Sequence, residues 1–299
     1  MYCFTKTLDN QVFYGLMSPT SRYNAMVKEE LVSHIICVVN NKGGVGKSTA
    51  TLNLSHCLAN KGYRVLVVDQ DPQSNTTKIL LGGTPENNTL YDIYSRSERI
   101  ENCIFPTTYE NLSCLPNIPR TAAIEMDLYQ DVRSSYLLLR NAIRQYCTDN
   151  FDFTLIDCPP NLGLFVMQAL MTTDFVIVPV ETGSRFALDG LTAAIELIEN
   201  LNKTVNPDLR FLRLLINKVD LRTSISKSSV DHIRKKFGKD LTFDVTIPIN
   251  TEFQKAEAQG KTIIRYAPKS TGAKRYRMLA DELCGILNVG ALPKEASNG

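Results

Sequence analysis

Residues 42–49 read Lys-Gly-Gly-Val-Gly-Lys-Ser-Thr, and this loop constrains the fold more than any other part of the chain. It follows a short apolar run, residues 34–40, which is typical of a buried parallel strand. It precedes residues 50–60, where apolar residues recur at helical spacing until Lys61-Gly62 ends the pattern. A strand, a glycine loop and a helix in this order predict a phosphate-binding site, because loop N–H groups and the helix dipole favour anions.

The residue types in the loop suit individual tasks. Glycines let the backbone close around phosphate oxygens. Lys47 would reach the β- and γ-phosphates of a nucleotide, and the hydroxyl of Ser48 would bind Mg²⁺. The residues expected to bind the nucleotide phosphates are Gly43, Gly44, Val45, Gly46, Lys47, Ser48 and Thr49.

Strand-like and helical patterns alternate along the rest of the chain. The strand-like segments are residues 63–69, 112–116, 153–157, 174–180, 212–217 and 242–247. The helical segments are residues 90–104, 136–147, 164–171, 188–201, 230–237 and 274–287. This alternation predicts an α/β fold, a mostly parallel, doubly wound sheet flanked by helices on both faces.

No linker or repeat divides this pattern. We therefore expect one domain over residues 34–288. We expect residues 1–33 to form an N-terminal extension, with a short helical pattern over 23–32, and residues 289–299 to form a flexible tail.

Composition narrows the class of protein. With 43% hydrophobic and 21% charged residues, the chain is ordinarily globular. Its eight cysteines form no CxxC pair or Cys/His cluster, which favours reduced, buried thiols over metal ligands. No apolar run approaches the length of a membrane span, and the N-terminus lacks a signal peptide's apolar core.

Charge is unevenly distributed along the chain. Residues 203–277 contain 17 Lys and Arg against 7 Asp and Glu, whereas the remainder contains 16 basic and 24 acidic residues. A basic C-terminal third favours a surface that faces a polyanion, although solvated helix faces would give the same imbalance.

Carboxylates stand at the ends of two predicted strands. Asp69 opens the sequence Asp-Gln-Asp-Pro-Gln-Ser-Asn, and Asp157 ends an apolar strand before Cys-Pro-Pro-Asn. Ligands of open α/β sheets bind at the carboxyl ends of the strands. A carboxylate there can hold Mg²⁺, and another, such as Asp71, can orient a water for attack on the γ-phosphorus.

A second lysine, Lys42, stands five residues before Lys47 at a position that the general loop pattern leaves open. With this loop and the segments that begin at Asp69 and Asp157, the chain resembles the deviant Walker A ATPases of the ParA/MinD family. The resemblance implies that Lys42 crosses a dimer interface to phosphates bound by the partner subunit. It also implies that Asp71 positions or activates the attacking water and that Asp69 lies near Mg²⁺.

The nucleotide base is indicated by two further segments. Read literally, Asn217-Lys218-Val219-Asp220 is a guanine signature. Within the resemblance, however, Asn217 would contact adenine, and Pro248 and Asn250 would lie along it. We therefore favour ATP with Mg²⁺ over GTP.

Only some of the family's DNA-binding positions carry a basic residue in this chain. Relatives carry arginines where this chain has Ile249 and Glu252, and Asn161 replaces a serine in the segment after Asp157. Arg222 matches a DNA-linked arginine of the family. The residues expected to contact DNA phosphates are Arg222, Arg234, Lys235, Lys236, Lys269, Lys274 and Arg275.

The resemblance implies a ParA-type ATPase that dimerises with ATP, binds DNA non-specifically, and segregates or positions DNA or another cargo. A ParB-like or other adaptor would stimulate hydrolysis, in the bacterial or archaeal cytoplasm and on the nucleoid. The alternative is a MinD-like or other positioning ATPase that acts through protein partners. A membrane-bound form is disfavoured by a tail without a basic amphipathic helix, and an iron–sulfur protein by the absence of a suitable cysteine pair. A metabolic P-loop enzyme stays open, whereas a non-enzymatic scaffold is least favoured.

Overall fold

The computed structural model describes residues 33–182, 187–220 and 222–290. Within these ranges, seven strands form one sheet in the order β3-β4-β2-β5-β1-β6-β7. Neighbouring strands are parallel except for the edge pair β3 and β4, which is antiparallel. The strands are β1 (His34–Val38), β2 (Val65–Asp69), β3 (Phe105–Pro106), β4 (Leu112–Leu115), β5 (Phe153–Asp157), β6 (Phe175–Glu181) and β7 (Arg210–Asn217).

The central strands are buried on both faces. In β1, Ile35 and Cys37 belong to the core on one face of the sheet, while Ile36 and Val38 belong to the core on the other. Helices cover both faces, so a central strand needs an unbroken apolar run rather than an alternating one. This is why the strand before the glycine loop is recognisable from sequence.

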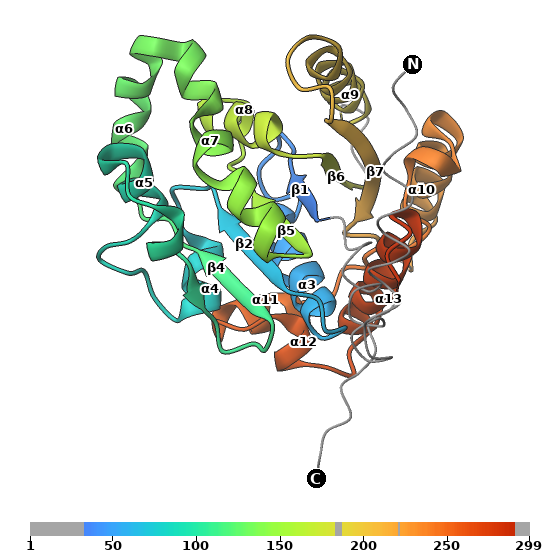
Figure 1. Cartoon of the computed structure of the whole chain (residues 1–299). Coiled ribbons are helices and arrows are strands. Elements are labelled where there is room, and N and C mark those ends of the chain that lie inside the picture. Colours follow the sequence, from blue (N-terminus) through green and yellow to red (C-terminus); the bar gives the residue numbers. More distant parts are fainter. Residues whose placement is uncertain (1–32, 183–186, 221, 291–299) are drawn as a thin grey trace, which may run out of the picture. The chain divides into compact units, whose positions relative to one another are not determined.

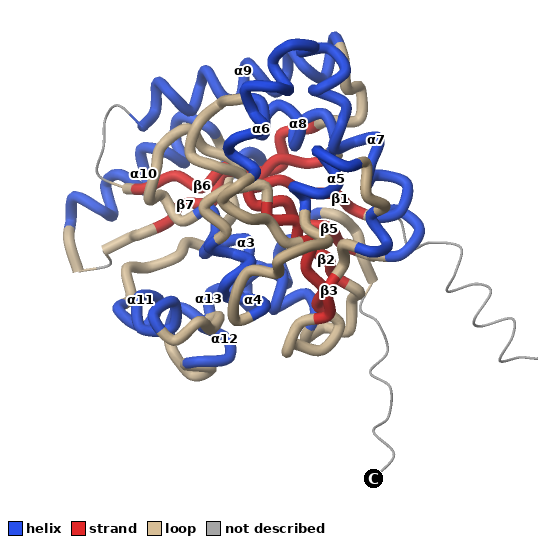
Figure 2. The backbone as a smooth tube through the Cα atoms, turned by 90° about the vertical axis from the view of Figure 1, so that its left-hand side faces the viewer, coloured by secondary structure: helices blue, strands red, loops and turns tan. Residues whose placement is uncertain are grey.

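Figure 2 shows the sheet between two layers of helices. One layer contains α3 (Lys47–Ala59), α4 (Asn75–Leu81), α11 (Thr251–Ala258), α12 (Ile263–Tyr266) and α13 (Thr271–Ile286). The other contains α5 (Leu90–Arg96), α6 (Thr121–Leu128), α7 (Val132–Asn150), α8 (Leu164–Thr172), α9 (Ala187–Thr204) and α10 (Ser224–Phe237). The 3₁₀ turns are η1 (Ile100–Asn102), η2 (Tyr129–Asp131) and η3 (Lys239–Leu241).

The predicted α/β fold is confirmed, with one element wrong. Residues 242–247 were expected to form a strand, but their pairing with β7 is limited to an isolated bridge between Thr242 and Leu214 and to the N–H groups of Phe243 and Ile247, which donate to Leu214 and Ile216. The N–H groups of Asp244 and Val245 donate to the carboxylate of Glu282 on α13 instead. Because these donors turn toward α13, the segment cannot continue as an eighth strand.

Two predicted segments fall wholly or mostly outside the described residues. They are residues 1–32 of the extension, including the helical pattern over 23–32, and residues 291–299 of the tail. The seven described cysteines are buried free thiols, as expected. Among the described helices, none combines the length and the apolar character needed to cross a membrane.

Candidate functional site

The phosphate loop joins the carboxyl end of β1 to the first turn of α3 (Figure 1). Gly44 and Gly46 have φ angles of 75° and 92°, a region that side chains with a Cβ rarely adopt. A Cβ added at Gly46 would lie 2.3 Å from Nδ2 of Asn217. The loop therefore needs glycine at position 46 for both its backbone conformation and its close contact with β7.

Asn217, the last residue of β7, braces this loop. Its side chain is buried, and its Nδ2 donates to the carbonyl of Val45 over 2.8 Å. Its Oδ1 accepts from the N–H of Lys218 over 2.9 Å. The adenine contact expected of Asn217 stays a prediction, and the bracing contact is one that the sequence did not indicate.

Lys47 lies inside the loop. Only 7% of the residue is exposed, and its Nζ donates to the carbonyl of Lys42 over 3.2 Å. Burial lowers the pKa of Lys47, while the nearby carboxylates of Asp157 and Asp71 and the Cys158 thiol oppose this shift. A buried cation beside glycine N–H groups is suited to bind an anion that replaces its lost hydration.

Two buried carboxylates lie side by side under the loop. Asp69 and Asp157 are register partners at the ends of β2 and β5, and both are fully buried. The N–H and hydroxyl of Thr77 donate to Oδ2 of Asp69 over 2.8 and 2.6 Å. The hydroxyl of Thr76 donates to Oδ2 of Asp157 over 2.6 Å. These threonines, in the first turn of α4, were missed because only the fold brings them under the two strands.

Their environment raises the pKa values of both acids. Burial, and next the charge of Asp157, raises the pKa of Asp69 to about 8. Burial raises the pKa of Asp157 to about 6, while the hydrogen bond from Thr76 and the nearby Ser48 hydroxyl lower it. Oδ1 of Asp157 is buried and has no hydrogen-bond partner among the described residues. Paired carboxylates, a serine hydroxyl and an orphaned oxygen are a donor set that suits Mg²⁺.

Asp71 lies farther out, at the start of the turn that leads to α4. Its N–H donates to Oδ1 of Asp69 over 3.2 Å, and its own Oδ1 accepts from the N–H of Gln73 over 2.9 Å. The residue is half-buried and lines a cavity together with the phosphate loop. It is thus placed where a carboxylate could face both solvent and a bound phosphate.

This cavity has a volume of about 460 Å³. One side is the phosphate loop from Gly43 to Thr49, and another is the segment from Asp71 to Ile79. The wall that the sequence did not indicate contains Phe253, Gln254, Lys261, Thr262 and Ile263, from α11, α12 and the turn between them. No local motif marks these residues, since only the return of the chain toward α3 brings them to the loop.

Like Asn217, the other two predicted adenine residues lie close to β7 but do not line this cavity. Pro248 faces Val219 through an isolated bridge just after β7. Oδ1 of Asn250 accepts from the N–H of Glu252 over 2.9 Å and caps α11. The fold therefore brings Asn217 and Pro248 to one end of β7, and their contact with a base stays a prediction.

Asp220, the acid of the guanine-type signature, is engaged with an arginine. Its two oxygens accept from Nε and Nη2 of Arg222 over 3.0 and 2.9 Å. These hydrogen bonds lower the pKa of Asp220 to about 2. An acid that already accepts from a guanidinium is poorly disposed to read a guanine edge.

The predicted DNA residues lie in two basic clusters along the chain, one on α10 (Arg234, Lys235 and Lys236) and one at the start of α13 (Lys269, Lys274 and Arg275), while Arg222 lies between β7 and α10. Arg234 of α10 donates to the carbonyl of Asp244, and the N–H of Asp244 donates to Glu282 of α13 over 2.6 Å. The segment after η3 thus contacts both α10 and α13. The exposed members of the clusters are Lys235, Lys236, Lys269 and Lys274, whereas Arg234 and Arg275 are half-buried.

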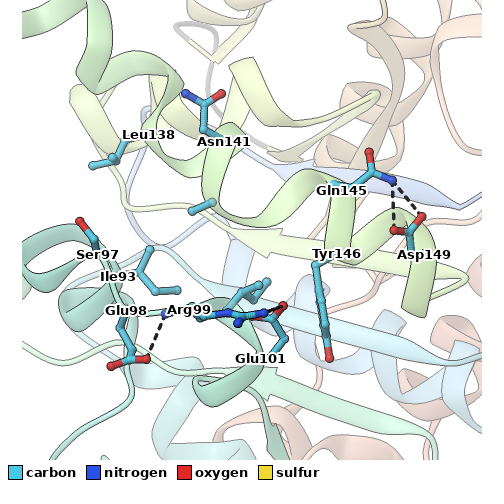
Figure 3. A pocket seen from close by; sticks show the side chains of 12 residues that line it. Ile93, Ser97, Glu98, Arg99, Glu101, Leu138, Asn141, Gln145, Tyr146 and Asp149 are labelled. Atoms are coloured by element: carbon cyan, nitrogen blue, oxygen red, sulfur yellow. Dashed lines mark hydrogen bonds and ion pairs between the residues drawn. The ribbon is translucent and has the colours of Figure 1, made fainter.

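A second cavity, of about 530 Å³, lies between α5, η1 and α7 (Figure 3). Its charged residues are Glu98, Arg99, Glu101 and Asp149. Arg99 pairs with Glu101 over 3.0 Å, and the Gln145 amide donates to Asp149. None of the residues predicted from sequence to bind nucleotide lines it.

Comparisons with known proteins agree with this geometry. A family model described as an AAA domain (AAA_31) matches residues 33–211. The chain is 36% identical to the sporulation initiation inhibitor protein Soj of Bacillus subtilis, over 83% of this chain and 97% of that protein. It is also 36% identical to the chromosome partitioning protein ParA of Myxococcus xanthus, over 84% of this chain and 88% of that protein.

A solved structure shares the fold. It is the cobyrinic acid a,c-diamide synthase of Mycobacterium smegmatis with a bound ATP analog and magnesium, at 27% identity and a TM-score of 0.73. The match covers 89% of this chain and all of that one.

The doubly wound sheet and the glycine loop at its carboxyl edge define a P-loop nucleotide-binding protein. With these relatives, the chain belongs to the ParA/MinD family of ATPases. It is an ATPase whose cofactors are ATP and Mg²⁺, as the sequence predicted.

Proposed function

We propose that this chain is a ParA-type ATPase that forms a homodimer with ATP, with both nucleotides in the interface. The ATP dimer binds DNA without sequence preference and segregates or positions DNA or another cargo, on the nucleoid in the cytoplasm. A ParB-like or other adaptor stimulates hydrolysis and dissolves the dimer. The names of the relatives, which include chromosome partitioning, support this proposal.

Each site residue receives a role in the hydrolysis. Lys47 neutralises charge on the β- and γ-phosphates, and the loop N–H groups orient the phosphates. Asp71 holds the attacking water in line with the bond that breaks, and accepts hydrogen bonds from it. Ser48, Asp69 and Asp157 would hold Mg²⁺, which, when bound, neutralises charge that develops on the leaving phosphate.

The observation that carries the dimer proposal is the position of Lys42. Although it adjoins Gly43 of the loop, Lys42 does not line the cavity, and 48% of its side chain is exposed. Its Nζ lies 3.1 Å from Glu181 at the end of β6, whereas Lys47 points into the loop. These positions support a division in which Lys47 serves the phosphates of its own subunit and Lys42 serves those of a partner.

Dimerisation is tested with a non-hydrolysable ATP analog and Mg²⁺ in analytical ultracentrifugation. We expect the wild-type chain to dimerise with the analog and not with ADP. Lys42→Ala should retain binding of the analog but lose the dimer, whereas Lys203→Ala, at an exposed lysine of α9, should dimerise normally. A Lys42→Ala dimer of wild-type strength would refute the crossing role.

The proposed DNA surface consists of the two basic clusters on α10 and at the start of α13. The proposal is supported by the contacts of Asp244 with both α10 and α13. Lys235 and Lys274 therefore lie on two helices that contact the same segment. Lysines and arginines that meet phosphates would give salt-sensitive binding without base readout. Arg222 would contribute least, because it already pairs with Asp220.

DNA binding is tested by fluorescence anisotropy with two duplexes of unrelated sequence. We expect binding with ATP but not with ADP, equal for both duplexes, and weaker as salt rises. Lys235→Glu should weaken binding and reduce its salt dependence, while Lys203→Glu serves as the charge-matched control. Absence of ATP-dependent binding at low salt would remove DNA from the proposal.

A second candidate is a MinD-like positioning ATPase that acts through protein partners. It is favoured by Ile249 and Glu252, which stand where relatives carry arginines. Ile249 is 58% exposed, and Glu252 pairs with Lys255 over 2.7 Å. An exposed apolar residue beside a neutralised charge suits a protein contact better than a phosphate contact.

A further inference from the structure

Glu181 is a carboxylate near the nucleotide loop that none of the proposed roles uses. It ends β6 and is the register partner of Asn217 on β7. Its Oε2 lies 3.1 Å from Nζ of Lys42, and its Oε1 lies 3.9 Å from Nζ of Lys218. One carboxylate therefore faces two lysines, of which Lys218 lines the nucleotide cavity.

The backbone around Lys42 is fixed to the same strand that carries Glu181. Nδ2 of Asn40 donates to the carbonyl of Pro179 on β6 over 2.7 Å. Oδ1 of Asn40 accepts from the N–H of Lys42 over 2.9 Å. Asn40 thus sets the distance between the base of the Lys42 side chain and β6. Lys42 can change partner only by swinging its side chain away from Glu181.

The contact is weak enough to break. The side chains of Lys42 and Glu181 are 48% and 30% exposed, so solvent screens the pair. A triphosphate carries several negative charges and is a stronger acceptor for an ammonium than one screened carboxylate. The ammonium would therefore exchange Glu181 for phosphate oxygens when such a group comes within reach.

We propose that Glu181 is a positioning residue that holds the Lys42 ammonium within its own subunit until the triphosphate of a second copy of this chain competes for it. Glu181 thereby sets the protein concentration at which the ATP dimer forms. This inference rests on the proposed function, in which Lys42 crosses the dimer interface. It adds a competing contact within the monomer.

The expected change in the dimer dissociation constant follows from the exposure of the Lys42–Glu181 pair. An exposed ion pair changes an equilibrium by about two- to fivefold. A two-fold symmetric dimer breaks the contact once in each subunit. Loss of the carboxylate should therefore lower the dimer dissociation constant by about four- to 25-fold.

The experiment measures two constants with a non-hydrolysable ATP analog and Mg²⁺, for wild type, Glu181→Gln and Glu181→Ala. Ultracentrifugation gives the dimer dissociation constant, and a fluorescent analog at protein concentrations below the dimer range gives the affinity of the monomer. Circular dichroism checks that each variant is folded. Glu110→Gln, at an exposed glutamate before β4, is the charge-matched control.

We expect both Glu181 variants to form tighter dimers at an unchanged monomer affinity, and Glu110→Gln to match wild type. An unchanged or weaker dimer would overturn the inference, as would a tighter dimer explained wholly by a higher monomer affinity, which would indicate action through Lys218. If wild type itself does not dimerise with the analog, the proposed function fails, and that outcome is distinct from the others.

Discussion

The two cavities described above are similar in size and opposite in chemistry. The nucleotide cavity, of about 460 Å³, is bordered by glycine N–H groups, a buried lysine and a buried pair of carboxylates beneath them. The second, of about 530 Å³, holds charges that lie in water and pair with one another. The larger cavity is therefore the less plausible binding site.

Desolvation accounts for the difference. Burial shifts the pKa values of Lys47, Asp69 and Asp157 toward their neutral forms, so these groups lack the solvation that a ligand could replace. At Glu101 and Arg99, hydrogen bonding between the two side chains shifts each pKa toward the charged form. A charge that is already satisfied adds little when a ligand arrives.

The largest difference between variants of the two cavities should be in the rate of ATP hydrolysis. Asp71→Ala should lower the rate of ATP turnover by about 100-fold or more, because a carboxylate that orients water contributes on that scale. The variant should still bind ATP and should accumulate as the ATP dimer. Steady-state phosphate release and ultracentrifugation measure both properties. Asp149→Ala, in the second cavity, is the matched control, and wild-type turnover in Asp71→Ala would remove Asp71 from the chemistry.

The second largest difference between variants of the two cavities should be in nucleotide affinity. Lys47→Ala should weaken ATP binding by about 30-fold or more, since truncating a buried charge contact costs about 2–5 kcal/mol. Calorimetric titration with the ATP analog measures the loss. Arg99→Ala removes a cation from the second cavity and should bind the analog as wild type does. Equal affinities for all three proteins would mean that Lys47 does not contact the phosphates.

The free energy of unfolding should show how much the buried carboxylates destabilise the fold when no cation is bound. An acid whose folded pKa is raised contributes stability below its unfolded pKa and loses it as pH rises through the folded value. For Asp157 this window runs from about 4 to about 6. At pH 8 without Mg²⁺, Asp157→Asn should therefore raise the free energy of unfolding by about 1–3 kcal/mol.

Urea denaturation at pH 8 and pH 4 measures this gain, which should vanish at the lower pH. The same variant should lose Mg²⁺-dependent turnover, so stability and activity should move in opposite directions. Glu101→Gln should show no such gain at either pH. A destabilised Asp157→Asn at pH 8 would show that the carboxylate is well solvated or paired without a cation.

The smallest change in ATP turnover should result from substitutions in the second cavity. The double variant Arg99→Ala/Asp149→Ala should change ATP turnover by less than about twofold, because its side chains are exposed and lie outside the nucleotide cavity. Turnover should be measured with and without DNA. A larger change would mean that this cavity communicates with the nucleotide site.

Much of the site could be predicted because its residues stand in short contiguous segments at the ends of strands. The loop at 42–49 and the carboxylates of Asp69 and Asp157 each follow a buried strand, and parallel strands bring their ends to one edge. What the sequence could not show depends on segments that return from far along the chain. The contact of Asn217 with Val45 and that of Glu181 with Lys42 are of this kind.

The fold shows the same division. Long periodic segments were found, whereas the short helices α4, α6, α11 and α12 were not, because a helix such as α12 has only four residues and little period to detect. The segment 242–247 was misread because its apolar residues suit a strand, while the direction of its N–H groups depends on Glu282 of a distant helix.

The strand order also sets when this site can exist during synthesis. β1 carries the loop, yet His34 pairs with Phe153 and Ile36 with Phe175, so its neighbours follow by about 120 to 140 residues. At about 5–20 residues per second, a ribosome needs roughly 6 to 28 s to add them. Until then, the nascent loop lacks the strands that hold it, and a ribosome-bound chain that ends before β5 should not retain ATP. The nucleotide can therefore act as a ligand of a chain that extends past β6 but not as a template for its first half.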